Sequence, residues 1–585
     1  MKGYNKIKIT LLFILFIFSI NSFSQFSKTH YIPPIGTQGQ GSGTPQIQYM
    51  YISTPNENPI DVIITPIGGD PITVSISNSN PYEYFIGNGN QTNFIALSEN
   101  SGQTFNNKGF IVEGEDLVYV SARLFTSDAY YQAAGLVSKG LAALGTTFRV
   151  GTFENLGDDM SNSFLNFVTV LATEDNTTVN FSDFGNGVTV VNNAPINDVI
   201  LNSGESYLIA IKPGDNINNS DGLIGVLVES DKPIAVNSGS ITGSNANTTT
   251  DSNGQDAGID QIVPVERIGT EYIFVRGIGP DQIERPLIVA HEPNTEVYVN
   301  GTLEYTIAQA GEHYSVPSSF YGVSYDQYGQ GPDIGVSSNM YVETSKPVFA
   351  YQVIGGIRPG TEGPFGAGTG IPNQGLFFVP PINCQTPSIV NNIAAINKLG
   401  PDFAFGGVVT IVTETGSTVL INGNDISDFA GDVQPVNGNP LFETYTVEGL
   451  TGNVSIVSSS QVYVASFGAY DYATFGGYYS GFAYQPEIVL EEITVGSEGC
   501  IPNLELRLNS ISIFDQYQWY FNGEMIDGAI GNSFTPTEPG YYQISGAVDD
   551  CEGILLSDNI PVSACPPDTD FDGVNDNIDI DIDND

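Results

Sequence analysis

The stretch "DKPIAVNSG", Asp231–Gly239, joins a polar turn with a proline to a short run of β-branched and small residues. A turn of this kind followed by such a run is typical of the start of a β-strand. The same pattern recurs along the chain as "NPIDVIIT" (58–65), "DLVYVSA" (116–122), "NTTVNF" (176–181), "NTEVYVNG" (294–301), "SKPVFAYQ" (345–352), "GSTVLING" (416–423) and "SQVYVASFG" (460–468). These recurrences indicate a fold built from repeats.

The spacing of the recurrences defines the repeating unit. Alternate runs are separated by nearly constant distances, which are 119, 118 and 122 residues for Ile60, Val179, Val297 and Val419, and 116, 114 and 114 residues for Val118, Ile234, Val348 and Val462. The sequence therefore predicts a unit of about 117 residues with two similar halves, present four times between residues 49 and 486.

Two all-β architectures fit this period. A half of about 57 residues with three or four strand-like runs has the size of one four-stranded propeller blade, and eight such halves would close a ring without exposed sheet edges. A whole unit of about 117 residues has the size of one β-sandwich, so four sandwiches in tandem are the alternative. We expect a propeller-like domain.

The charge balance excludes two classes of partner. The 585 residues include 65 acidic and 17 basic ones, and the net charge is −48. A surface of this charge repels nucleic acids and anionic membranes. With 41% hydrophobic residues the chain is folded rather than disordered.

The first 24 residues predict export. Lys2, Lys6 and Lys8 precede the apolar run "LLFILFIFSI" (11–20), and small residues follow, as in a cleaved signal peptide. The run is too short for a membrane span, which needs about 20 apolar residues. We expect residues 25–48 to form a linker.

Export makes disulfides the expected state of the four cysteines. Cys500 and Cys551 flank one compact segment and are the predicted pair, and the pairing of Cys384 and Cys565 stays open. Of the three histidines, His30, His291 and His313, His291 begins "HEPNT", which lacks the second His of a zinc-protease helix, so we expect a structural or surface role for His291.

Residues 487–565 resemble an immunoglobulin-like module of exported bacterial surface proteins. In "YQWYFNGEMIDGAIGNSFTPTEPGYYQISG", Trp519 would fill the core, "NGEMIDGA" would form a hairpin, and Tyr541 or Tyr542 would bond back to the backbone as a tyrosine corner.

The end of the chain, "DTDFDGVNDNIDIDIDND", predicts a calcium site. Asp-x-Asp-x-Asp-Gly spacing is found in the first half of calcium loops, where a hard cation collects several oxygens. No closing Glu and no helical pattern accompany it, so residues 566–585 resemble a thrombospondin type 3 repeat whose last turn is incomplete. The candidate ligands are Asp568, Asp570, Asp572, Asp576, Asp579, Asp581 and Asp583.

The segments "ESDKPIAVNSG" (229–239) and "ETSKPVFAYQ" (343–352) resemble the N-terminal domain of the IgG-Fc-binding protein family, which occurs in bacterial surface proteins. The whole arrangement is similar to that of multi-module adhesins of Bacteroidetes-type bacteria. The resemblance implies a protein at the extracellular or outer-membrane surface of a Gram-negative bacterium, with a sorting domain beyond residue 585. It implies no ligand-binding residues.

We therefore expect a calcium-stabilised adhesin that binds a glycan or a surface protein. The alternatives are a structural subunit of a surface assembly and, third, a polysaccharide-acting enzyme. Catalysis is not expected, because no carboxylate pair can be selected from 65 acids without geometry.

Overall fold

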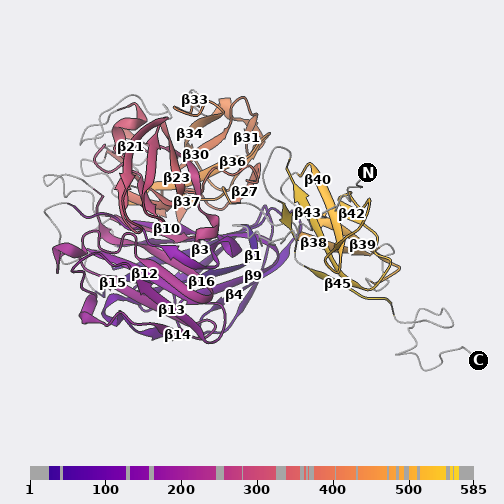
Figure 1. Cartoon of the computed structure of the whole chain (residues 1–585), viewed down its shortest axis with the longest axis horizontal. Helices are drawn as coiled ribbons and strands as arrows, with labels where there is room; N and C mark the ends of the chain where they lie inside the picture. Colours follow the sequence, from indigo (N-terminus) through magenta and orange to yellow (C-terminus); the bar gives the residue numbers. More distant parts are fainter. Residues whose placement is uncertain are drawn as a thin grey trace, which may run out of the picture. The chain divides into compact units, whose positions relative to one another are not determined.

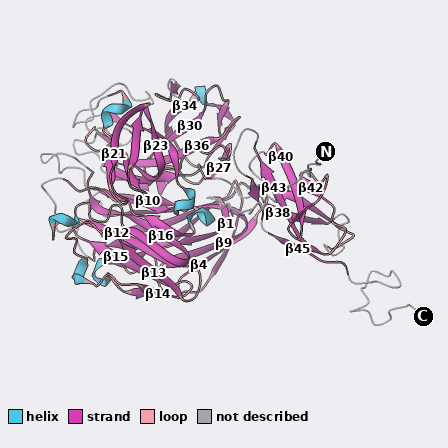
Figure 2. Cartoon of the chain, in the orientation of Figure 1, coloured by secondary structure: helices cyan, strands magenta, loops and turns pink. Residues whose placement is uncertain are grey.

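The computed structural model describes two compact units. Among the described residues, the larger unit comprises 26–482 and the smaller one 487–565. Strands dominate both, and the described helices are short 3-10 turns (Figure 2). The described residues are 26–565 except 40–43, 127–131, 157–163, 246–255, 278, 280, 324–337, 356–361, 364–365, 368–373, 402, 430–432, 471–472, 483–486, 493–499, 510–513, 549–553 and 558.

The larger unit contains four repeats of the same strand order (Figure 1). The first consists of β1 (Ser27–Ile32), β3 (Ile47–Ser53), β4 (Ile60–Pro66), β5 (Ile72–Ile76), β6 (Tyr82–Gly87), β9 (Phe110–Phe125) and β10 (Ala133–Val137). The second consists of β11 (Gly145–Arg149), β12 (Leu165–Ala172), β13 (Thr177–Ser182), β14 (Val199–Leu201), β15 (Ser206–Ile211), β16 (Leu227–Gly243) and β17 (Asp256–Ile262).

The third and fourth repeats follow the same plan. The third consists of β18 (Gly269–Val275), β19 (Leu287–Ala290), β20 (Thr295–Val299), β21 (Thr302–Ile307), β22 (His313–Ser315), β23 (Asn339–Gly355) and β26 (Gln374–Phe378). The fourth consists of β27 (Ile389–Ile393), β30 (Gly406–Glu414), β31 (Val419–Ile421), β32 (Asn424–Asp425), β34 (Phe442–Leu450), β35 (Val454–Ser458), β36 (Val462–Tyr470) and β37 (Ala473–Tyr478).

One long strand organises each repeat. The first half of β9 pairs with β1 and β4, and its second half pairs with β3 and β10. β16 pairs in the same way with β11 and β13 and then with β12 and β17. β23 pairs with β18 and β20 and then with β19 and β26. In the fourth repeat the long strand is divided into β35 and β36, which lie in separate sheets. Each of the first three repeats is therefore two groups of strands joined by one long strand, whereas the two groups of the fourth repeat form separate sheets.

The all-β class and the 117-residue period are confirmed, but the interpretation of each half as a separate blade is wrong. Ile60, Val179, Val297 and Val419 lie in β4, β13, β20 and β31, whereas Val118, Ile234, Val348 and Val462 lie in the long strands. In the first three units the two recurrences are thus neighbouring strands of one repeat, because β4 pairs with β9, β13 with β16 and β20 with β23. In the fourth unit β31 pairs with β35, and Val462 lies in the next strand, β36. Four members, not eight, make the ring.

The last strand of each repeat lines the axis of the ring. β10, β17, β26 and β37 contact one another in a closed cycle, in which β10 touches β17 and β37, and β26 touches the same two strands. Glycines allow this close approach: a Cβ at Gly258 would lie 2.7 Å from the Leu376 Cβ, and one at Gly477 would lie 2.8 Å from Val137. The four repeats therefore form a propeller-like ring and not a string of independent sandwiches.

Asp256, the first residue of β17, joins all four repeats. Its Oδ1 accepts the backbone N–H of Ala133 at 3.0 Å and that of Ala257 at 2.8 Å, and its Oδ2 accepts those of Gln374 at 3.2 Å and Thr474 at 3.0 Å. The side chain is fully buried. Burial raises the pKa of Asp256 well above its ordinary range, against the effect of the four N–H donors.

A second buried carboxylate lies further along β17. Asp260 forms an ion pair of 2.7 Å with Lys139, which follows β10, and accepts the N–H of Phe378 in β26 at 2.9 Å. Neither member of the pair is more than 1% exposed. Two layers of polar contacts thus hold the axis strands together.

Arg123 on β9 closes the ring between the first and fourth repeats. Its guanidinium donates to the carbonyls of Ala394, Ala395 and Lys398 at 2.7–2.9 Å. The same group lies 4.0 Å from the ring centroid of Tyr51 and 4.7 Å from that of Phe475, distances typical of cation–π contacts. The buried cation is therefore fully used in joining the first repeat to the last.

The apolar core also crosses repeat boundaries. The cluster around Val168, Ile209 and Val236 of the second repeat continues into the third through Leu287 and Phe349. The expectation that residues 25–48 are a linker is corrected, since β1 pairs with β9 and β2 (Ile35–Thr37) pairs with β7 (Ile95–Leu97).

The smaller unit consists of two sheets. One contains β38 (Glu487–Glu492), β39 (Leu504–Asn509) and β42 (Ser533–Phe534), and the other contains β40 (Gln516–Phe521), β41 (Glu524–Met525), β43 (Gly540–Ala547), β44 (Leu555–Leu556) and β45 (Ile560–Val562). Trp519 is fully buried in the core, as predicted. Tyr542 Oη donates to the carbonyl of Glu538 at 2.8 Å, so the predicted bond back to the backbone is made by Tyr542.

The predicted Cys500–Cys551 bridge is wrong. Cys500 is bonded to Cys565, 65 residues away. The segments around Ile501 and Ala564 run side by side, because Ile501 donates to the carbonyl of Ser563 and accepts the N–H of Cys565. This parallel contact between distant segments has no local sequence signal, and Cys551 lies outside the described residues.

We predict that Asp256→Asn destabilises the whole ring. The amide nitrogen of Asn would face two backbone N–H donors, and each unsatisfied buried donor costs about 1–3 kcal/mol. Thermal unfolding of the full chain should show a lower Tm for the transition of the larger unit. Asp70→Asn, at an exposed position, is the control. Equal Tm values for the two variants would contradict the role of Asp256.

Candidate functional site

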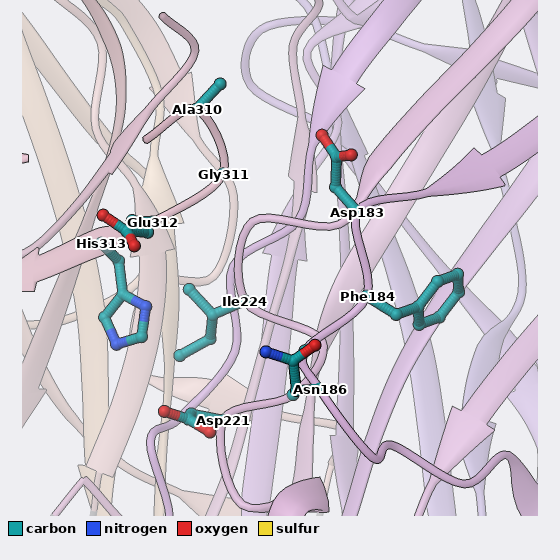
Figure 3. Close-up of a pocket in the computed structure, with 11 residues that line it drawn as sticks. Asp183, Phe184, Asn186, Asp221, Ile224, Ala310, Gly311, Glu312 and His313 are labelled. Atoms are coloured by element: carbon teal, nitrogen blue, oxygen red, sulfur yellow. The ribbon is translucent and has the colours of Figure 1, made fainter. Parts of the chain in front are cut away.

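A cleft with a volume of about 340 Å³ opens between the second and third repeats. Residues 183–186, after β13, and 221, 222 and 224, before β16, form one wall, and residues 310–312 with His313, the first residue of β22, form the other. Figure 3 shows Asn186 and Asp221 on the first wall and Glu312 and His313 on the second, with the ring of Phe184 turned away from them.

Arg149, the last residue of β11, fixes the first wall. Its Nη1 donates to Asp183 Oδ2 and to the carbonyl of Gly225, both at 2.7 Å. The guanidinium is buried, whereas the Asp183 side chain is 44% exposed to the cleft. Both hydrogen bonds bind the Arg149 guanidinium to the first wall, so the cation is not available to a ligand.

Two glycines let the walls approach each other. Gly225 has a φ of +83°, and a Cβ at this residue would overlap the carbonyl oxygen of Gly311. Gly311 has a φ of +81°, and its Cβ would lie 2.9 Å from Arg149 Nη1. The base of the cleft is thus a backbone-to-backbone contact that only glycine permits.

A buried ionic group supports the second wall. Glu154 of the second repeat pairs with Arg285 of the third, and His313 Nε2 lies 3.6 Å from Glu154 Oε1. Burial alone would raise the pKa of Glu154, but hydrogen bonding from His313 and the charge of Arg285 lower it below its usual range. Glu154 is therefore an anion that orients the His313 ring.

The cleft offers mainly hydrogen-bond acceptors. Asp221 and Glu312 form no salt bridge with any described residue, and the Asn186 amide can both donate and accept. Such a lining suits a ligand that presents N–H, O–H or cationic groups. No cluster of three or more metal-binding side chains occurs in the part of the chain that the structure describes.

The candidate sites from sequence fall elsewhere. The Asp residues from Asp568 to Asp583 lie outside the described residues. His30 has a structural role, since it is fully buried and contacts Ser138 Oγ and the carbonyls of Ser27 and Val118. His313 was not expected to line a cleft. The only sequence signal would have been the recurrence of Gly-Glu-x-Tyr at 204–207 and 311–314.

Residues 134–468 match the model of the family described as IgGFc binding protein. The chain belongs to this family. The match covers more than half of the chain, begins in β10 and ends in β36, so it spans the second, third and fourth repeats with the cleft between two of them. Membership of this family supports a binding protein.

Comparison with individual proteins adds little. No curated protein matches the chain. Among solved structures, Sidekick-1 immunoglobulin domains 1–5 are 8% identical, with 92% of this chain and all of that chain covered and a TM-score of 0.10. A Ca²⁺-stabilised adhesin with which an Antarctic bacterium binds ice is 12% identical over 79% of this chain and all of that chain, with a TM-score of 0.09. A Salmonella alpha-2-macroglobulin mutant is 9% identical over 94% of this chain and 47% of that chain, with a TM-score of 0.12. These scores are too low to inform fold or function.

Within the described residues, no helix has the length and apolar character needed to cross a membrane.

We predict that Gly225→Ala destabilises the junction between the second and third repeats more than Gly301→Ala does. Both glycines have a φ of +83°, but a Cβ at Gly301 would meet nothing within 4 Å. The shared backbone strain costs about 1–2 kcal/mol, and the overlap at Gly225 should add about 1–3 kcal/mol. Chemical unfolding of the two variants measures the difference. Equal destabilisation would show that the two walls do not touch at this residue.

Proposed function

We propose that the four-repeat ring is the ligand-binding part of an exported cell-surface adhesin whose ligand is a surface protein or a glycan. The observation that carries this proposal is the family match, because residues 134–468 include the second and third repeats, most of the fourth, and the cleft. The cleft supplies a concave site with several polar groups, and its volume lies at the lower end of the range for ligand pockets, about 300–1,000 Å³. We infer that the chain acts by binding and not by catalysis.

The proposed location is the outer surface of a Gram-negative bacterium. Residues 1–24 would act as the export signal. The Cys500–Cys565 disulfide supports an oxidising compartment outside the cytoplasm. The net charge of −48 argues for a ligand that is neutral or cationic.

We also propose that the C-terminal part is a spacer leading to a calcium-stiffened stalk. The smaller unit, with its two sheets, buried Trp519 and Tyr542 corner, supports the immunoglobulin-like module. Calcium would bind among the alternating carboxylates of residues 568–583, where it would neutralise a run of like charges.

Arrays of surface proteins, immunoglobulins and glycans test the binding function. The full chain should bind one of these classes saturably, since the proposal assigns it a ligand-binding ring. Arrays without saturable binding would contradict the proposal. Turnover of a bound polysaccharide would also contradict the proposal, if replacing one carboxylate pair abolished that turnover.

We predict that calcium protects the C-terminal end of the full chain from proteolysis. Binding to the native state alone stabilises by RT ln(1 + [Ca²⁺]/Kd), about 2.7 kcal/mol at a hundredfold excess over Kd. Limited proteolysis with and without a chelator should show calcium-dependent protection between Cys565 and Asp585. Replacing Asp568, Asp570 and Asp572 by Asn should abolish the protection. A cleavage pattern that calcium does not change would rule out the site.

A further inference from the structure

β15 of the second repeat and β22 of the third repeat are equivalent strands, and each faces the repeat that precedes its own. β15 begins at the Ser206 of "GES", Gly204–Ser206, β22 begins at the His313 of "GEH", Gly311–His313, and a tyrosine comes next in both, Tyr207 and Tyr314. Each strand pairs on one side with the second strand of its own repeat, β15 with β12 and β22 with β19. Ser206 and His313 are therefore equivalent positions.

The other edge of β15 is occupied. β8 (Thr104–Phe105), from the first repeat, pairs antiparallel with β15, with Phe105 opposite Ser206 and Thr104 opposite Tyr207. The N–H of Gly102 continues this contact by donating to the carbonyl of Leu208 at 2.9 Å. At this junction an extended segment of the chain fills the space between two repeats.

No described strand occupies the same edge of β22. The connection that carries β8 is 22 residues long, from 88 to 109, whereas the equivalent connection of the second repeat, from 212 to 226, has 15 residues. The shorter connection contains η4 (Ile217–Asn219) but no described strand equivalent to β8. The cleft thus reaches the first residue of β22, His313, beside the edge that corresponds to the β8 side of β15.

The backbone of β22 presents hydrogen-bonding groups at this edge. Glu312 and Val316 bond toward β19, since Ala290 donates to the carbonyl of Glu312 and Val316 donates to that of Pro286. In an antiparallel strand, alternate residues bond to opposite sides. The N–H and C=O groups of His313 and Ser315 therefore point away from β19. In β15 the carbonyl of Leu208 likewise points away from β12, and it accepts the N–H of Gly102.

The side chains at this edge favour a cation. Asp221 and Glu312 line the cleft from opposite walls and form no described salt bridge, and Arg149 is already committed to Asp183. A cationic segment would also be attracted by the net charge of −48.

We infer that the cleft binds an extended, basic segment of a partner polypeptide, which adds as a strand to the free edge of β22 and places a Lys or Arg between Asp221 and Glu312. Such addition of a strand to a sheet edge is a common mode of peptide recognition, in which main-chain bonds give affinity and side-chain pockets give specificity. The inference rests on the proposed binding function and specifies its ligand as protein.

The chain itself supplies a probe peptide. A fluorescent ten-residue peptide with the sequence SGQTFNNKGF copies Ser101–Phe110, the segment that includes β8. In the register of β8 on β15, its Phe105 lies opposite His313. The carbonyl of Lys108 accepts from Ser206 Oγ at 3.1 Å in the first junction, so Lys108 of the peptide falls beside His313, the equivalent of Ser206. The comparison peptide carries Glu in place of Lys108.

Fluorescence polarisation with the full chain should show binding of the lysine peptide, and the glutamate peptide should bind about tenfold more weakly because it faces two carboxylates. The double variant Asp221→Asn, Glu312→Gln should weaken binding of the lysine peptide about tenfold and reduce its salt dependence. The control variant Glu304→Gln replaces an exposed carboxylate of β21 outside the cleft and should bind like the parent chain. Circular dichroism and Tm confirm that the variants are folded.

A second variant tests the strand edge. Ser315→Pro removes an N–H that faces away from β19 and should weaken both peptides, because proline cannot donate at a pairing edge.

Three outcomes would overturn the inference. The first is no binding of the lysine peptide up to about 1 mM. The second is binding that the Asp221, Glu312 double variant does not change. The third is binding of a neutral oligosaccharide, or self-association of the chain, that the double variant abolishes while neither peptide binds. If arrays detect a ligand that the double variant still binds, the proposed function stands and only the assignment of the cleft fails.

Discussion

Four backbone N–H groups, one from the last strand of each repeat, converge on the carboxylate of Asp256. The axis strands β10, β17, β26 and β37 contact one another but do not pair with one another as sheet neighbours, so their inner edges need acceptors from side chains. Asp256 supplies them near one end of β17, and Asp260 with Lys139 supplies a second layer. Without the carboxylates of Asp256 and Asp260, buried backbone N–H groups of the axis strands would have no hydrogen-bond acceptor.

A shared scaffold with variable connections explains how the ring can carry a site. The first three repeats keep the long strand with its four partners, the fourth divides that strand into β35 and β36, and the connections between strands differ in length. The connection that reaches from the first repeat supplies β8 and closes its junction, while the shorter connection of the second repeat leaves the cleft with Asp221 and Glu312. The ring therefore fixes the positions of both walls, and loop length decides which junction is open.

The sequence predicted the all-β class and the 117-residue period because β-branched runs after polar turns mark strand starts. It could not show that Ile60 and Val118 belong to neighbouring strands of one sheet, since pairing between distant segments leaves no local pattern. The same limit explains the Cys500–Cys565 bridge. The recurring glycines of the axis strands, such as Gly258 and Gly477, are visible in the sequence. Only the structure shows that they allow neighbouring axis strands to approach each other closely. The cleft depends on the length of a connection relative to its equivalent, which requires the repeat boundaries first.

The ring can be tested most directly by hydrogen–deuterium exchange of the full chain, followed by mass spectrometry of peptides from β10, β17, β26 and β37. If the four repeats form one closed body around Asp256, the amides of these four strands should exchange last and at a common rate, because they open only when the whole ring unfolds. Different rates for the four strands, each matching the rest of its own repeat, would show that the repeats unfold independently and would contradict the ring.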